Sequence, residues 1–213
     1  MKLFTYFRSS AAYRVRIGLN LKRIDYEAEP IHLRRKEHEA VAFAAINPQR
    51  LVPALLVGPD VLTQSLAILE YLEETHPSPP LLPEDPLDRA RVRAIAMSIA
   101  CDIHPIDNMR VLNYLKDPLG QEQETVDQWY RHWIETGFAA LERTLATDGK
   151  AGRFCHGDRP TLADVCLVPQ VHNARRGNVD LTPYPAIVRI DEACRALPAF
   201  AEAAPDRQPD AEG

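Results

Sequence analysis

The sequence predicts a small α/β domain followed by an all-helical domain. Strand-like and helix-like segments alternate over residues 1–76, and only helix-like segments follow the stretch after it. That stretch, residues 76–86, holds five prolines in eleven residues and is typical of a stiff linker, because proline continues neither flanking helix. We therefore expect domains at 1–76 and 87–203, a linker at 77–86 and a flexible tail at 204–213.

The N-terminal domain begins with a strand, a helix and a second strand. The apolar and aromatic run KLFTYF, residues 2–7, favours a strand. Val15 and Leu19 recur at the spacing of one helical face, which predicts a helix at 10–21. The run DYEAEPI, residues 25–31, is interpreted as the second strand.

In the second half of this domain the sequence predicts a helix, a β-hairpin and a further helix. A helix is expected at 34–46 because Asn-Pro closes it. The apolar runs 53–57 and 61–63 flank the turn sequence Gly-Pro-Asp, which predicts a hairpin. Ser65 is a natural N-cap for a helix at 65–75. This order is typical of a mixed sheet with helices on both faces.

Helical periodicity runs through the rest of the chain. The expected helices are 87–115, 123–146, 161–175 and a segment from 184 onward. Thr161 and Asp164, in the motif PTLAD, predict a capping box at the start of the third of these helices. We interpret both residues as structural.

Composition restricts the partners and the compartment. A net charge of −5 argues against nucleic acid or an anionic membrane as the main partner. No apolar run has the length of a signal peptide or a membrane span. The four cysteines lack metal-site spacing, so we expect free thiols, a cytoplasmic protein and no metal.

Two serines stand at the first junction of strand and helix, in the stretch FRSSAAYRVRIGL. One of Ser9 and Ser10 is a natural N-cap, and this structural role is the more common one. Alternatively, the hydroxyl and the free N–H groups of the helix end bind an anion such as a thiolate. A serine nucleophile is disfavoured because the sequence has no GxSxG motif and no histidine near this stretch.

Two further motifs of this domain suit ligand contacts. Val52-Pro53 lies directly before a strand and suits a cis proline, which leaves backbone groups to pair with an extended peptide ligand. Gln64 and Ser65 open a helix, and this second helix end suits a carboxylate. Each motif alone is weak evidence for a ligand site, because a single helix cap is more often structural.

The order of these motifs is specific. The chain resembles the glutathione transferase fold, whose first domain is thioredoxin-like, in the order of its motifs. These are a strand with RSS at a helix start, Val-Pro before a strand, Gln-Ser at a helix start, a proline-rich linker and then helices. Over nearly its whole length, the chain resembles the zeta class of this family. The stretches that carry this resemblance are FRSSAAYRVRIGLNLKRIDYE, QSLAILEYLEETHPSPPLLPEDPLDRARVRAI, GDRPTLADVCLVPQVHNARRGNVDLTPYP and the late RQPD.

The resemblance implies glutathione as the cofactor and indicates its contacts. Ser9 and Ser10 would flank the glutathione sulfur, and Val52 would pair with the cysteinyl backbone ahead of a cis proline. Gln64 and Ser65 would bind the γ-glutamyl end. The other implied contacts are His38 and Gln49 at the glycyl end, and His104 and Asn108 from the helical domain.

The chain departs from the zeta pattern at two positions. Ala11 stands where the class has a cysteine, so the thiol of glutathione is the simpler choice for a thiolate mechanism. Arg110 stands where the class commonly has a small residue. We expect Arg8, Arg110 and Arg176 to bind carboxylates and developing negative charge, because guanidinium binds carboxylate in a bidentate way. The other two arginines of FRSSAAYRVRIGL are interpreted as scaffold.

The activity that the resemblance implies is the cis–trans isomerisation of a dicarboxylate conjugated to a ketone. A thiolate adds to the double bond, the resulting single bond rotates, and elimination leaves the trans isomer. We expect maleylpyruvate, as in gentisate breakdown, over maleylacetoacetate, as in tyrosine breakdown, because an extra arginine suits closely spaced charges. The alternatives are a zeta-class transferase or dehalogenase, and a binding module without activity. A homodimer is expected from the family alone.

Overall fold

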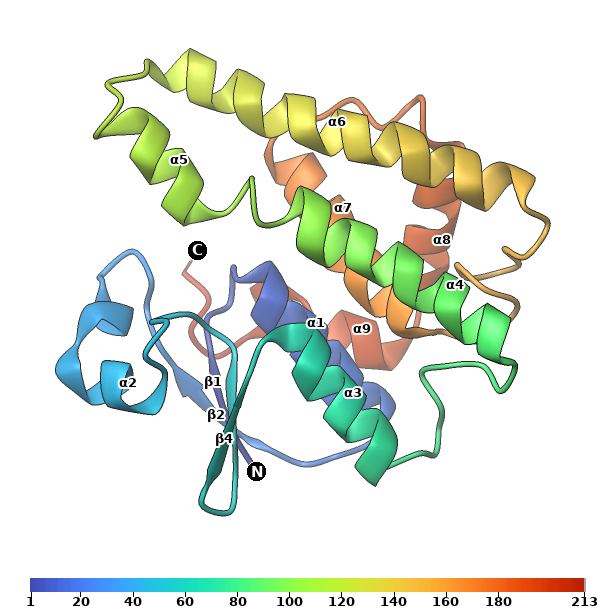
Figure 1. Ribbon diagram of the computed structural model, residues 1–213, viewed down its shortest axis with the longest axis horizontal. Helices are drawn as coiled ribbons and strands as arrows, with labels where there is room; N and C mark the ends of the chain where they lie inside the picture. Colours follow the sequence, from blue (N-terminus) through green and yellow to red (C-terminus); the bar gives the residue numbers. More distant parts are fainter. Residues whose placement is uncertain (213) are drawn as a thin grey trace. The chain divides into compact units, whose positions relative to one another are not determined.

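The computed structural model describes residues 1–212, which divide into two compact units. The first unit holds residues 1–81 together with 196–212, and the second holds residues 82–195. Figure 1 labels the α-helices of both units and three of the strands. The sequence predicts a helical domain that extends to residue 203, whereas in the structure residues 196–212 belong to the first unit.

A four-stranded mixed sheet forms the centre of the first unit. Its strands are β1 (Lys2–Thr5), β2 (Glu27–Pro30), β3 (Ala54–Val57) and β4 (Asp60–Thr63), in the order β2-β1-β3-β4. β1 pairs in parallel with β2 and antiparallel with β3, and β3 and β4 form the expected hairpin. The predicted mixed sheet is confirmed. β1 is shorter than expected, because Tyr6 and Phe7 belong to the loop that precedes α1 (Ser10–Leu21).

Successive residues of β1 contribute to opposite faces of the sheet. Leu3 packs with residues of α1 and of α3 (Ser65–Thr75), among them Val15 and Ile68. Phe4 packs on the other face against Phe43 of α2 (Val41–Ile46), with the two rings 5.8 Å apart. The prediction of helices on both faces of the sheet is therefore confirmed.

Two expected helices are interrupted. The segment 34–46 contains a short 3-10 helix, η1 (Glu37–Glu39), before α2, because Lys36 has a left-handed φ of 60° and Ala40 is extended. The segment 87–115 contains α4 (Pro86–Met97), the π-helical turn η2 (Ser98–Ile103) and α5 (Met109–Lys116). Asn108 begins α5 anew, since its side chain caps that helix.

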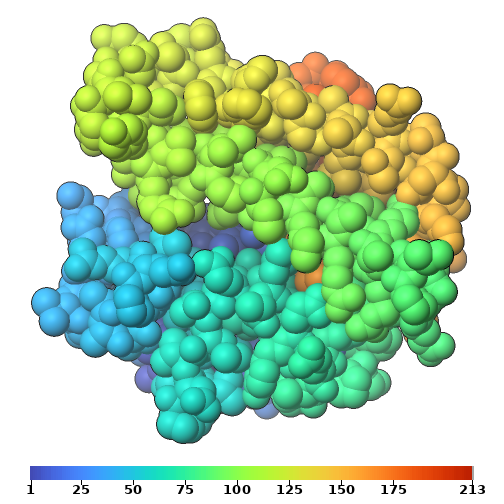
Figure 2. Space-filling view, in the orientation of Figure 1, coloured from blue at the N-terminus to red at the C-terminus, as the bar shows by residue number. Residues whose placement is uncertain are grey.

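The second unit is built around α7 (Leu162–Arg176), whose residues are almost all buried. α7 packs against α4 and α8 (Pro185–Arg195), and α6 (Gln123–Thr147) packs against α8. Figure 2 shows α4, α5 and α6 forming much of the visible surface of this unit, in green to yellow. The predicted capping box is confirmed, because Thr161 donates its backbone N–H and its hydroxyl to Asp164, at 2.7 and 2.9 Å.

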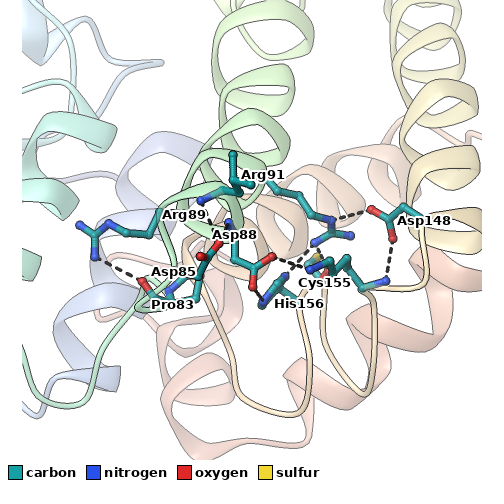
Figure 3. Close-up of polar contacts among 10 residues, drawn as sticks. Pro83, Asp85, Asp88, Arg89, Arg91, Asp148, Cys155 and His156 are labelled. Atoms are coloured by element: carbon teal, nitrogen blue, oxygen red, sulfur yellow. Dashed lines mark hydrogen bonds and ion pairs between the residues drawn. The ribbon is translucent and has the colours of Figure 1, made fainter.

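A polar cluster joins the start of α4 to the loop after α6 (Figure 3). The Arg91 guanidinium donates to Asp148 and, at 2.9 Å, to the carbonyl of Cys155. Asp88, in the first turn of α4, pairs with Lys150 at 2.9 Å. This loop is therefore held to α4 by charges on both sides.

The C-terminal segment is ordered against α1. It contains α9 (Pro198–Ala203) and the 3-10 helix η3 (Pro205–Arg207). Tyr13 of α1 donates to the carbonyl of Phe200 at 3.4 Å, and Arg16 donates to that of Ala203 at 3.0 Å. The expectation of a flexible tail at 204–213 therefore disagrees with the hydrogen-bonded arrangement of residues 204–212, and Gly213 lies outside the described residues.

Within residues 1–212, no helix combines the length and the apolar character needed to cross a membrane.

Candidate active site

The loop between β1 and α1 presents the first group of expected site residues. Ser9 is the N-cap of α1, and its hydroxyl oxygen accepts from the backbone N–H of Ala12 at 3.2 Å. That hydroxyl keeps its own proton for donation to an anion. Ser10 is the first helical residue and is buried. Both serines thus stand at the positive end of the α1 dipole, and Ser9 fills the structural capping role as well.

The three arginines of this region differ in their surroundings. Arg8 is partly exposed, and its guanidinium carbon lies 5.0 Å from the centre of the Phe7 ring. Arg14 and Arg16 are almost entirely buried in the first unit. Arg14 donates to the Ser65 hydroxyl at 3.4 Å, so this arginine stands directly behind an expected ligand contact. Only Arg8 of the three has the exposure that a substrate ligand needs.

The expected contacts near β3 and α3 come together in the structure. The Val52-Pro53 bond is cis, as the sequence predicted, and Val52 lies two residues before the start of β3. Gln64 donates to the side-chain oxygen of Gln49 at 2.9 Å, which joins two expected glutathione contacts.

Ser65 is the first residue of α3, whereas the sequence analysis placed it at the N-cap. Gln64 is the N-cap instead, with a φ of 69°, in the region where a residue other than glycine is strained. Backbone strain of this kind clusters at ligand-binding sites and costs about 1–3 kcal/mol.

His38 carries an unsatisfied polar atom. It belongs to η1, and its Nδ1 is buried with no hydrogen-bond partner among residues 1–212. An unsatisfied buried polar atom costs about 1–3 kcal/mol, so a polar ligand at this position would stabilise the loop. The role of His38 as a glutathione contact therefore stays a prediction.

The second unit holds the remaining expected residues in two places. Asn108 caps α5, and its side-chain oxygen accepts from the N–H of Arg110 at 3.0 Å. Arg110 is exposed in the first turn of α5. His104 follows the π-helical turn η2, and such turns are frequent at functional sites.

Arg176 ends α7 with an exposed side chain. Its guanidinium donates to the Tyr130 hydroxyl and to the side-chain oxygen of Asn173, each at 3.3 Å. Burial raises the pKa of Tyr130 while the Arg176 charge lowers it. Two neutral groups thus hold the Arg176 guanidinium, and no carboxylate pairs with it in these contacts, so its positive charge is open to an anion.

Asp107 and Tyr130 lie near these residues and are not marked by any sequence motif. Asp107 is 7% exposed, and neither carboxyl oxygen has a hydrogen-bond partner in the described part of the chain. Burial raises the pKa of Asp107 to about 8. No motif marks this aspartate in the sequence, since an isolated acidic residue in a polar stretch is usually exposed.

Taken by themselves, these groups suit an anionic, peptide-like ligand. A helix N-terminus with serine hydroxyls stabilises a thiolate, and the glutamine pair offers polar groups to a short peptide. Within residues 1–212 no three His, Cys, Asp or Glu side chains gather as a metal site. A thioredoxin-like unit with these groups, followed by a helical unit, defines a class of two-domain glutathione-binding proteins.

Comparison with known proteins gives the family. The model of the glutathione S-transferase N-terminal domain matches residues 3–80, and that of the C-terminal domain matches residues 123–202. A maleylpyruvate isomerase from a Ralstonia species is 53% identical over 99% of both chains. A probable maleylacetoacetate isomerase from Vibrio cholerae is 52% identical over 98% of this chain and 97% of its own.

Two solved structures agree with this result. A holo maleylpyruvate isomerase, described as a zeta-class bacterial glutathione S-transferase, is 53% identical with a TM-score of 0.98 over the whole of both chains. A maleylacetoacetate isomerase from Methylobacterium extorquens, with bound malonate and glutathione, is 44% identical with a TM-score of 0.97, also over the whole of both chains. The chain belongs to the zeta class of the glutathione S-transferase family. The predicted fold class is confirmed.

Proposed function

We propose that the protein is a glutathione-dependent cis–trans isomerase that converts maleylpyruvate to fumarylpyruvate. One observation carries the proposal: a single loop presents Arg8 together with Ser9 and Ser10 at the N-terminus of α1, and Ala11 leaves no protein thiol there. Bound glutathione supplies the thiolate that adds to the substrate double bond and later leaves it. The names of the relatives support a cis–trans isomerase, with maleylpyruvate as the substrate of the Ralstonia protein and maleylacetoacetate as that of the Vibrio protein.

In this proposal Ser9 and Ser10 act on the sulfur. A free thiol has a pKa of about 8.5, so the thiolate needs stabilisation at neutral pH. The Ser9 hydroxyl donates to the sulfur, and the N-terminus of α1 contributes its partial positive charge. Ser10 follows as the first residue of the same helix, so both serines are assigned to the thiolate.

The other glutathione contacts divide between strand, loop and helix. Val52 pairs with the cysteinyl backbone, and Gln64 and Ser65 bind the γ-glutamyl end. Gln49, fixed by its bond with Gln64, and His38, with its buried unpaired Nδ1, serve the glycyl end. His104 and Asn108 are the contacts proposed from the second unit.

The arginines hold the substrate. We assign Arg8, Arg110 and Arg176 to the two carboxylates and to the negative charge that develops on the ketone oxygen. Each is partly or fully exposed, so each is open to an anion. Fixed positive charge at the site of developing charge lowers the barrier, and anchoring both carboxylates keeps them in place while the bond between them rotates.

Maleylacetoacetate is the second candidate substrate. The Vibrio relative, at nearly the same identity as the Ralstonia one, favours it, whereas the additional Arg110 favours the more compact charge distribution of maleylpyruvate. The deciding experiment measures kcat/KM on both substrates, with and without glutathione. A higher kcat/KM on maleylpyruvate supports our assignment, and a large preference for maleylacetoacetate reverses it.

Zeta-class transferase chemistry is separated by glutathione stoichiometry, and dehalogenase chemistry, which conjugates glutathione only transiently, by the release of halide from an α-halo acid. An isomerase returns glutathione unchanged, so the thiol concentration stays constant over many turnovers. A transferase consumes one glutathione per turnover. Failure to bind glutathione at millimolar concentration would favour a binding module without this activity.

We also infer a cytoplasmic homodimer. No disulfide joins the cysteines of the described chain, Cys101, Cys155, Cys166 and Cys194, which suits a reducing compartment. Light scattering coupled to size-exclusion chromatography tests the dimer, for which a mass near 48 kDa, about twice the 24.0 kDa of the chain, is expected.

A further inference from the structure

The late motif RQPD, residues 207–210, has no role in the proposed chemistry, yet its aspartate reaches the β1–α1 loop. The backbone N–H of Phe7 donates to the Asp210 carboxylate (Oδ2) at 3.0 Å, across 203 residues of sequence. Phe7 directly precedes Arg8 and Ser9. A charge-assisted hydrogen bond to a loop amide is among the stronger single contacts that fix backbone position.

The other side of the same loop is held by Arg16. Its guanidinium donates to the carbonyls of Phe7 at 3.1 Å and Tyr6 at 3.4 Å, and to the Thr5 hydroxyl at 3.0 Å. Its Nε donates to the carbonyl of Ala203 at 3.0 Å. Arg16 therefore ties the loop to the end of α9, and both peptide groups of Phe7 are held by contacts that involve residues 203–210.

The charges of the two anchors support one another. Burial lowers the pKa of Arg16 to about 10, and the nearby Asp210 carboxylate acts in the opposite direction. A buried guanidinium is costly without nearby negative charge, so the aspartate offsets part of this cost. Asp210 thus contributes a hydrogen bond to the loop and a charge to the arginine beneath it.

The C-terminal segment is itself anchored on both sides of Asp210. Gln208 donates from one side-chain nitrogen to the carbonyls of Glu202 and Ala204, each at 2.9 Å. Glu212 pairs with His32 at 3.0 Å and with Arg35 at 2.7 Å, just beyond β2. Asp210 is therefore presented to Phe7 from a segment with fixed ends.

Phe7 transmits this restraint to Arg8, the residue proposed to bind the substrate. Its ring lies under the Arg8 guanidinium at 5.0 Å and packs edge-on against Tyr6 with ring centres 4.9 Å apart. Fixing the Phe7 backbone fixes the ring, and the ring supports Arg8. The path from Asp210 to Arg8 therefore passes through one residue.

We propose that Asp210, at the end of the segment 203–212, is a positioning residue that holds Phe7 and thereby orients Arg8 and Ser9 for the reaction. The proposal rests on the proposed function for its kinetic consequence, but not for the structural restraint itself. A displacement of about 1 Å at a reacting group lowers rates by up to 100-fold, which sets the scale of the effect.

The test compares three variants of the full-length protein. Asp210→Ala removes the acceptor of the Phe7 N–H and is expected to lower kcat about 10- to 100-fold on the dicarboxylate. The glutathione Kd, measured by calorimetry, should change less than about threefold, because most proposed glutathione contacts lie elsewhere. Asp210→Asn keeps an acceptor oxygen and should retain kcat within about threefold. Asp206→Ala, an exposed carboxylate of the same segment, is the matched control and should equal the wild type.

A second readout is independent of activity. Hydrogen exchange of the Phe7 amide, followed by NMR, should be at least about tenfold faster in Asp210→Ala and unchanged in Asp206→Ala, because only the first variant frees this N–H. Wild-type kcat in Asp210→Ala overturns the positioning role. Equal losses in all three variants overturn it as well, since they would reflect general destabilisation.

The outcomes separate this proposal from the proposed function. If the wild type isomerises neither candidate substrate, the proposed function fails, and the exchange rate of the Phe7 amide decides the restraint by itself. Unchanged exchange in Asp210→Ala then overturns it, and faster exchange confirms that Asp210 holds the loop.

Discussion

The buried carboxyl of Asp107 predicts an unusual dependence of stability on pH. The side chain is 7% exposed, and its oxygens lack hydrogen-bond partners in the described chain. Burial raises its pKa to about 8, whereas an unfolded aspartate has a pKa of about 3.9. Between these values the folded protein holds a proton that the unfolded chain releases. Stability from this group is therefore full below about pH 4 and is lost as pH rises toward 8.

The magnitude follows from the proton balance. When one proton is released on unfolding, the free energy of unfolding falls by about 1.4 kcal/mol for each pH unit. From pH 5 to pH 7 the loss is therefore about 2.7 kcal/mol. Asp107→Asn cannot ionise, so the stability of the wild type relative to this variant should fall by that amount over the same range.

Urea unfolding at pH 5, 6 and 7 measures this difference. Trp129 reports on the region, because its indole N–H donates to the carbonyl of Ile106, next to Asp107, at 2.9 Å. Subtracting the free energy of unfolding of the variant from that of the wild type cancels the contributions of the other titrating groups. Asp102→Asn, at an exposed carboxyl on the preceding turn, is the control and should follow the wild type at each pH. A constant difference between wild type and Asp107→Asn, within about 0.5 kcal/mol over this range, would refute the reasoning.

Three further predictions follow from particular contacts. Arg110→Ala and Arg176→Ala should each lower kcat/KM on the dicarboxylate about 10- to 100-fold with little change in glutathione affinity, and unchanged kinetics in both would remove the arginine assignment. Asp164→Ala should lower the free energy of unfolding by about 3–5 kcal/mol in urea denaturation, because the buried N–H groups that donate to its carboxylate lose their acceptor; a loss under 1 kcal/mol would contradict this. Gly18→Ala should lower Tm by the equivalent of about 1–3 kcal/mol of unfolding free energy, because the added methyl group would overlap the Leu69 side chain. A Tm equal to that of the wild type would show that α3 moves away without cost.

Local patterns predicted the elements of the first unit closely. α1 and α3 cover the ranges that the sequence predicts, although Gln64 rather than Ser65 is the N-cap of α3, and the β3–β4 hairpin follows its Gly-Pro turn. The breaks in two longer helices were not predicted. One depends on a left-handed Lys36 and the other on the π-helical turn before His104, and neither backbone conformation has a strong signature in composition.

The residues of the candidate site likewise fall into those that the sequence predicts and those that it does not. Ser9, Val52 and Gln64 are marked in the sequence because each stands at the end of an element, where backbone groups lack partners and where ligands bind. The pairing of Gln49 with Gln64 and the buried Nδ1 of His38 were not predictable, because both depend on side chains brought together from separate loops.

The sequence by itself determined the order of strands and helices, the two-domain class and the anion-binding helix end, since these depend on neighbouring residues and on periodicity. Tertiary structure decided that Asp107 is buried, that Arg16 lies inside the first unit, and that Asp210 meets Phe7. Burial and contact between residues about 200 positions apart depend on how the whole chain packs, and no local window of sequence contains that information.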